Sequence, residues 1–139
     1  MKKKRKASSP RKRLISALDR ACARYAKVRA GWRCERCGRQ YDEGDGRLQW
    51  SHHYSRRHHG IRWEDDNFSA HCGGCHIYLG GNPVEFERWI VAKLGPDRHA
   101  RLMMNKARPT KWSDADLVLL KDEIIRKTKE LEAARTAAG

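Results

Sequence analysis

Two Cys-x-x-Cys pairs constrain the fold of this chain more than any other feature. Cys34 and Cys37 form the first pair, Cys72 and Cys75 form the second, and 34 residues separate the inner cysteines. Four thiolates in this pattern are typical of a tetrahedral zinc site with a closed coordination sphere, which gives the ion a structural role. Such binding contributes on the order of 10–16 kcal/mol, enough to fold a small domain. The alternative is a set of unligated thiols in a reduced protein core.

The length of the chain makes a structural metal useful. With 139 residues it predicts one domain with a modest core. Five cysteines is an odd number, and neither a secretion signal nor an apolar run of membrane-spanning length accompanies them. We therefore expect a cytoplasmic protein without disulfides and without a membrane partner. The fifth cysteine, Cys22, is expected to pack as a small apolar residue.

Positive charge dominates the rest of the composition. Lys and Arg number 31 against 17 Asp and Glu, a net charge of +14, which favours a polyanionic partner, with nucleic acid first and a membrane surface second. Residues 1–13 contain eight basic residues and no acidic one, which predicts a disordered arm that is either solvated or bound to phosphate. Residues 14–135 then form the single domain, and residues 136–139 a tail.

The spacing of apolar residues predicts an α+β fold with helices at both ends. The expected elements are a helix at 14–30, a strand at 47–54, a short second strand at 60–63, a short helix within 67–79, a helix at 83–94 and a helix at 114–133. Asn82 and Ser113 are the expected N-caps, and Gly95 ends the helix that Asn82 begins, so residues 97–111 are expected to be irregular. The last helix packs within the chain or forms a dimer surface.

Histidines and one asparagine gather between the cysteine pairs. His52 and His53 end the predicted strand, Asn67 follows 14 residues after His53, and His76 comes directly after the second cysteine pair. Because four cysteines already satisfy a zinc ion, these side chains are free to form a second, open metal site. A neutral imidazole can take a proton from water, and a divalent ion can hold a phosphate oxygen and neutralise the leaving 3′-oxygen. This combination favours phosphodiester hydrolysis.

These residues also resemble a known motif. His52-His53, Asn67 and Cys72-x-x-Cys75-His76 resemble the HNH motif of ββα-metal nucleases. The flanking sequence is similar to the phage NinG (Rap) recombination-protein family over roughly residues 32–130, in the segments WSHHY, IRW and N-x-x-x-x-C-x-x-C. The resemblance implies a small zinc-stabilised ββα-metal (HNH) core flanked by an N-terminal helix and C-terminal helices. It also implies a phage or prophage protein that acts on DNA in a bacterial host cell.

The resemblance gives each residue of the motif a role. It implies that His53 is the general base and that Asn67 orients it across the loop. It further implies that His52 and His76 hold a catalytic divalent ion. Many HNH sites have Asp at the position of His52, so Mn²⁺ or another transition metal is an alternative to Mg²⁺.

Other residues of this region are open to more than one interpretation. Arg57 and Arg62 are candidates for contact with the scissile phosphate, and a solvated loop is the competing interpretation. His52 or His53 could instead replace a cysteine at the zinc or cap a strand. The remaining histidines of the region are expected to be loop residues rather than ligands: His58, His59 and His71.

Two functions of different class remain. The first is a metal-dependent HNH endonuclease that hydrolyses DNA, with branched recombination intermediates such as Holliday junctions among its candidate substrates. The second is a non-catalytic, zinc-stabilised nucleic-acid-binding accessory protein of recombination, which the positive charge alone would serve. A homodimer is expected only with the first, because symmetrical cutting of a junction needs two active sites.

Overall fold

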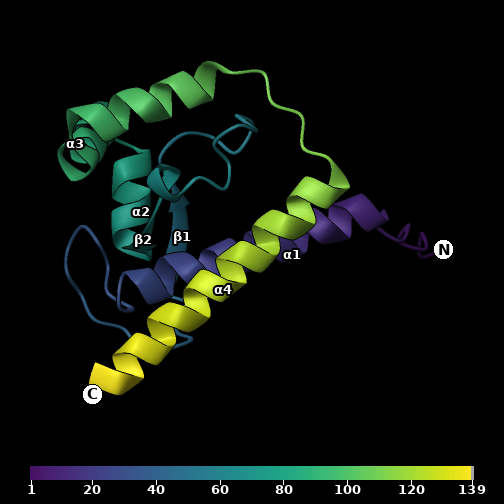
Figure 1. Ribbon diagram of the computed structural model, residues 1–139, viewed down its shortest axis with the longest axis horizontal. Coiled ribbons are helices and arrows are strands. Elements are labelled where there is room, and N and C mark those ends of the chain that lie inside the picture. The colour runs from purple at the N-terminus through teal and green to yellow at the C-terminus, as the bar shows by residue number, and fades with distance from the viewer. Residues whose placement is uncertain (139) are drawn as a thin grey trace.

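The computed structural model describes residues 1–138, and its framework is a pair of long helices, the first of which packs against a two-stranded sheet (Figure 1). Helix α1 (Pro10–Arg29) begins where the Ser9 hydroxyl accepts a hydrogen bond from the Lys12 N–H at 3.2 Å. Pro10 then occupies the first helical position, where its missing N–H costs nothing. The helix therefore begins four residues earlier than expected and takes in residues 10–13, which the sequence assigns to the basic arm.

Helix α4 (Asp114–Ala138) lies along α1, as Figure 1 shows for the yellow and purple ribbons. Its N-cap is confirmed: Ser113 and Asp116 exchange hydrogen bonds between side chain and backbone N–H at 3.0 and 3.1 Å. The helix continues past the predicted end at residue 133 into the predicted tail at 136–139, of which residue 139 lies outside the described residues.

The main hydrophobic core lies between these helices and the sheet. Its buried members are Leu18, Cys22, Tyr25, Ala26, Trp63, Phe68, Leu117 and Ile124. The apolar face of α4 thus packs within the chain, which is one of the two expected alternatives. Cys22 is fully buried and burial raises the pKa of its thiol, which confirms the expected packing role.

The two strands are antiparallel, and the second one is not where the sequence predicts it. Strand β1 (Leu48–His52) falls within the expected range, and β2 (Phe68–Cys72) pairs with it from Leu48↔Cys72 to His52↔Phe68. The predicted strand at 60–63 is wrong, because residues 58–64 close successive turns. The predicted helix within 67–79 begins only at Gly73, after β2, and continues as α2 (Gly73–Gly80).

The sheet has an apolar face and a polar face, because neighbouring residues of a strand point to opposite sides. Trp50 and Phe68 pack together on the face that meets α1. Ser51 and Ser69 are direct cross-strand partners on the other face. There they meet His76 of α2 and Lys93 of the next helix along the chain. This polar face carries most of the candidate site.

Helix α3 (Pro83–Ala107) corrects the prediction for residues 97–111. Gly95 has φ 77° and ψ 167°, so the helix breaks there as expected, but a second helical segment follows and reaches Ala107. Leu102 of this segment is fully buried with Ile90 and Leu94 of the first segment, which explains why it is helical. The whole is an α+β fold, and no helix within residues 1–138 is long and apolar enough to cross a membrane.

Candidate metal centre and the polar face of the sheet

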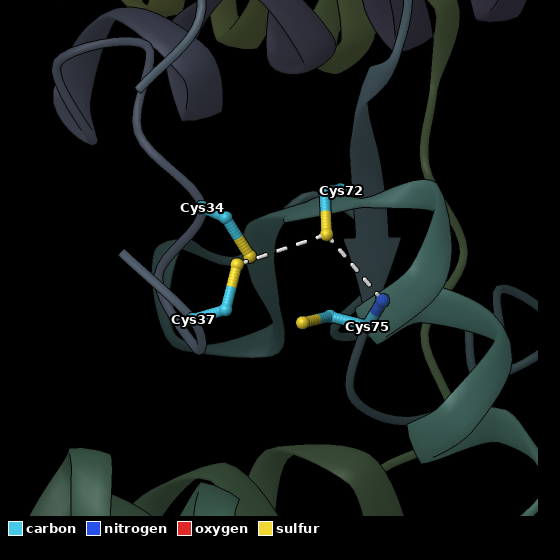
Figure 2. A group of neighbouring side chains, drawn as sticks. All are labelled: Cys34, Cys37, Cys72 and Cys75. Carbon is cyan, nitrogen blue, oxygen red and sulfur yellow. Dashed lines mark hydrogen bonds between the residues drawn. The ribbon is translucent and has the colours of Figure 1, made fainter. Parts of the chain in front are cut away.

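The four cysteines meet at one point, where the turn after α1 approaches the junction of β2 and α2 (Figure 2). Their sulfur atoms all lie within 4.8 Å of one another. The Cys37 and Cys72 sulfurs are 3.9 Å apart, close to the roughly 3.8 Å between ligands of a tetrahedral ion bonded at about 2.3 Å. The predicted cysteine cluster is therefore confirmed, and its donor set and spacing fit a structural metal such as zinc.

The local structure favours a thiolate at Cys72, whereas burial raises the pKa of Cys75 to about 12. The Cys72 sulfur caps α2 and accepts a hydrogen bond from the Cys75 N–H at 3.4 Å. Burial raises the pKa of Cys72, but this N–H and the neighbouring thiols together lower it to about 7. Arg36 adds a hydrogen bond from its guanidinium to the Cys75 sulfur at 3.4 Å. A soft cation would complete this arrangement.

Glu35, inside the first cysteine pair, fastens that turn to β2. Its backbone N–H donates to the Ala70 carbonyl at 2.9 Å, and its carboxylate accepts from the Ala70 N–H at 2.6 Å. The other carboxylate oxygen lies 2.9 Å from the Lys93 ammonium. The metal centre is thereby connected to the polar face of the sheet.

His53 lies at the end of β1 with 7% of its surface exposed. The distance from its Nδ1 to the Asp66 carbonyl is 2.8 Å, and a carbonyl can only accept, so Nδ1 carries the proton. Its Nε2 then accepts from the Ser69 hydroxyl at 2.6 Å. Burial, and next the Lys93 ammonium, hold the pKa of His53 well below its usual range. The ring is therefore neutral at neutral pH.

A chain of polar contacts runs from His53 to the metal centre. Lys93 donates to the Ser69 hydroxyl at 2.6 Å, so that hydroxyl can donate onward to His53. Burial lowers the pKa of Lys93, and Glu35 opposes the change. The sequence analysis misses Ser69, Lys93 and Glu35. Glu35 alone carries a sequence signal, because it lies between two predicted metal ligands. Lys93 carries none, because a lysine on an amphipathic helix is usually solvent-exposed.

Asn67 is fully buried and holds both ends of the loop that follows His53. Its Oδ1 accepts from the Tyr54 N–H at 2.9 Å, and its Nδ2 donates to the carbonyls of Tyr54 and Ile61 at 3.2 and 3.0 Å. Its own carbonyl accepts from the His53 N–H at 2.7 Å. These are contacts through which Asn67 can fix the backbone that carries His53.

His52 and His76 are not brought together. The His52 Nε2 donates to the Arg62 carbonyl at 3.0 Å and its ring packs on Trp50, on the apolar face. Burial lowers the pKa of His52 to about 4. His76 is exposed on α2, and its Nδ1 lies 3.2 Å from the hydroxyl of Ser51. Strand alternation is the physical reason, since it turns Ser51 rather than His52 toward α2.

His71 corrects one expectation of the sequence analysis. Instead of lying in a loop it is part of β2 and fully buried, with its ring 4.8 Å from that of Trp89. Neither of its ring nitrogens has a hydrogen-bond partner among the described residues. The predicted loop positions of His58 and His59 agree with the structure.

The two candidate arginines differ in availability. Arg62 forms an ion pair with Asp19 at 2.6 Å and is mostly buried, so its guanidinium is used within the fold. Asp19 also accepts from the indole N–H of Trp63 at 2.8 Å. Arg57 is exposed, and only its backbone N–H has a hydrogen-bond partner in the described part of the chain.

The fold and the cysteine cluster define a small α+β protein built around a four-cysteine metal centre, with a polar sheet face beside it. The family model described as Bacteriophage Lambda NinG protein matches residues 1–134. The chain therefore belongs to the phage lambda NinG family, which is associated with phage recombination. No curated protein and no solved structure matches it.

Proposed function

We propose that this protein is a metal-dependent endonuclease with an HNH-type ββα-metal core. It hydrolyses phosphodiester bonds of DNA, including branched recombination intermediates such as Holliday junctions, to a 5′-phosphate and a 3′-hydroxyl. His53 is the general base, and Asn67 holds the loop that orients it. A zinc ion on the four cysteines supports the sheet and α2.

The hydrogen bonding of His53 is the observation that carries the proposal. Its Nδ1–H is held by the Asp66 carbonyl, and its Nε2 has a lone pair. Because burial holds its pKa well below the usual range, the ring does not need to lose a proton before it can accept one. For His53 to act on DNA, the attacking water must replace Ser69 as the donor to Nε2.

A catalytic divalent ion, Mg²⁺, Mn²⁺ or another transition metal, is part of the proposal. Within residues 1–138 the four cysteines are the one group of three or more Cys, His or acidic side chains suited to a metal. A second ion would therefore take one imidazole from His76, the Ser51 hydroxyl beside it, and the rest of its ligands from DNA and water. Bound there, it would neutralise charge on the phosphate and the leaving oxygen.

Cleavage assays on supercoiled plasmid and on four-way-junction DNA, with a series of divalent ions, test this proposal. His53→Ala should lower the cleavage rate roughly 100-fold or more, the usual contribution of a general base. His76→Ala should raise the metal concentration needed for half-maximal rate. His59→Ala, which changes an exposed loop histidine, is the matched control and should cut normally. No cutting with any ion, or normal cutting by His53→Ala, would refute the assignment.

A non-catalytic DNA-binding accessory protein of recombination is the second candidate. The near-complete burial of His53 favours it, because Nε2 already has a partner and water has little access. Its signature is salt-dependent DNA binding without metal-dependent cutting, and binding that is unchanged in His53→Ala. A homodimer is proposed only with the nuclease, since paired cuts across a junction need two active sites.

A further inference from the structure

Two segments far apart in the sequence contact each other and form one unit, which includes the loop that directly follows His53. They are the loop between β1 and β2 and the connection from α3 to α4, drawn in green in Figure 1. The Trp112 indole N–H donates to the His59 carbonyl at 2.9 Å, and Trp112 packs edge-on against Trp63. The Asn105 amide donates to the Glu64 carboxylate at 3.2 Å. The loop is thus held to the connection by Trp112 and to the end of α3 by Asn105.

Gly60 is what allows the two backbones to approach so closely. A Cβ atom at this position would lie 2.8 Å from the Thr110 hydroxyl and 2.9 Å from the Asn105 carbonyl. Contacts of that length do not occur for real side chains, and one of these two atoms belongs to the backbone. Any larger residue would therefore push the loop away from the connection. The sequence shows only a glycine in a polar loop, so this role needs the structure.

Basic side chains gather on this unit, and we call them the basic lobe. They are Arg56 and Arg57 from the loop, Lys106 from the end of α3, and Arg108 and Lys111 from the connection. Four of the five are exposed, and Lys106 is half-buried, with its ammonium 5.1 Å from the centre of the Tyr54 ring. None of them forms an ion pair with an acidic residue in the described chain.

Arginines elsewhere in the fold contrast with the basic lobe. Many are engaged by carboxylates: Arg11 by Asp114, Arg24 by Glu43 and Glu132, Arg47 by Asp45, Arg62 by Asp19, Arg98 by Asp66 and Arg126 by Glu130. The acids that border the lobe accept hydrogen bonds from neutral side chains and form no ion pair with the basic residues of the lobe. Glu64 accepts from Asn105, and Glu87 accepts from the Tyr54 hydroxyl at 2.7 Å. The positive charges of the basic lobe are therefore available to an anionic partner.

We propose that the basic lobe binds the phosphate backbone of DNA and presents the strand to His53. Tyr54 directly follows His53 and touches Lys106, so the lobe begins one residue from the candidate base. Guanidinium groups without acidic partners suit phosphate oxygens, and their contacts need no particular base sequence. The inference rests on DNA as the proposed substrate but not on catalysis.

Salt titration of binding measures the number of contacts. Each phosphate contact contributes about 0.9 to the slope of log K against log salt, equivalent to roughly fivefold in affinity at 0.15 M salt. The double variant Arg57→Ala/Arg108→Ala should therefore lower the slope by about 2 and weaken binding roughly 10- to 30-fold. The matched control is Arg126→Ala/Lys129→Ala, which removes the same charge from exposed positions on α4.

Binding should be measured with labelled duplex and four-way-junction DNA, without chelator and without added Mg²⁺ or Mn²⁺. The structural metal then stays in place and cleavage does not interfere. Equal losses in both double variants would overturn the proposal and indicate diffuse contact. The proposal would also be overturned if the wild-type protein did not bind DNA but bound anionic lipid vesicles or an acidic peptide. Because no cutting is involved, failure of the nuclease proposal leaves this result interpretable. Unchanged melting temperatures in both variants would show that the fold is intact.

Discussion

Asn67→Ala should destabilise the protein by about 3–4.5 kcal/mol, and the number follows from its contacts. The substitution removes three side-chain hydrogen bonds, one from the Tyr54 N–H and two to the carbonyls of Tyr54 and Ile61. A hydrogen bond between neutral groups contributes about 0.5–1.5 kcal/mol, so three contribute roughly 1.5–4.5 kcal/mol. Asn67 is fully buried, so water cannot replace its amide and the upper half of that range applies.

Asn67→Asp separates this explanation from simple loss of volume. The carboxylate can still accept from the Tyr54 N–H, but its second oxygen would face two carbonyls instead of donating to them. Desolvation and these carbonyls would raise the pKa of the new carboxyl above its unfolded value. The folded state would then bind the proton more tightly, so the lost stability should partly return as the pH falls toward 4.

Urea unfolding of the zinc-bound protein, followed by tryptophan fluorescence, measures both effects. Asn105→Ala is the matched control, because it also removes a side-chain amide, but one that contacts the half-buried Glu64 carboxylate. Water can replace that donor, so the cost should be smaller than for Asn67→Ala. Hydrogen exchange at the Tyr54 amide should also accelerate in Asn67→Ala. A cost below 1 kcal/mol in that variant, or wild-type stability in Asn67→Asp, would show that these contacts do not hold the loop.

Three further results are expected. Cys72→Ser should lower the zinc content, measured by elemental analysis, from one ion per chain. It should also abolish cooperative unfolding, since the ion contributes on the order of 10 kcal/mol. The control variant Cys22→Ser should keep its zinc. Lys93→Met should lower the free energy of unfolding in urea by about 1–3 kcal/mol, because Glu35 loses its partner in a mostly buried site. Lys93→Arg should restore part of the loss. Equal stability of wild type and Lys93→Met would contradict the ion pair between Glu35 and Lys93. His52 has a folded pKa of about 4 against an unfolded pKa of 6.5, so its contribution to stability is constant above pH 6.5 and is lost as the pH falls from 6.5 to 4. A His52→Gln variant should therefore show a shallower decline in melting temperature over that window than the wild type. An equal decline in both proteins would refute the buried, neutral ring.

The metal centre was predictable from sequence because its signal is local. Each Cys-x-x-Cys pair fixes two ligands in one turn, and the sequence contains only two such pairs to combine. The Ser113 cap was predictable for the same reason, because Ser113 and its partner Asp116 lie within one turn. Asn82 precedes α3 as expected, but its side-chain amide donates to the Tyr78 carbonyl and does not cap that helix. Cys22 could be placed in the core because its helical spacing matches that of neighbouring apolar residues.

The polar face of the sheet could not be predicted, because it depends on strand register. The sequence places a second strand at 60–63, whereas Phe68–Cys72 pairs with β1, and this register decides that Ser69 lies opposite Ser51. From it follow the partners of His53 and the burial of His71. Lys93 reaches this face from α3, and such a tertiary contact leaves no periodic signal in the sequence. The same limit explains Arg62, whose partner Asp19 is 43 residues away.

The pairing of α1 with α4 has a consequence for how the chain folds. Arg11 contacts Asp114 and Arg135 contacts the Arg29 carbonyl, so partners lie more than 100 residues apart. During synthesis at about 5–20 residues per second, the apolar face of α1 must wait several seconds for α4 to leave the ribosome. Contacts of such long range also slow folding. The four-cysteine cluster needs no residue beyond Cys75, so with a bound metal such as zinc it could assemble before α4 is synthesised and keep the nascent chain compact.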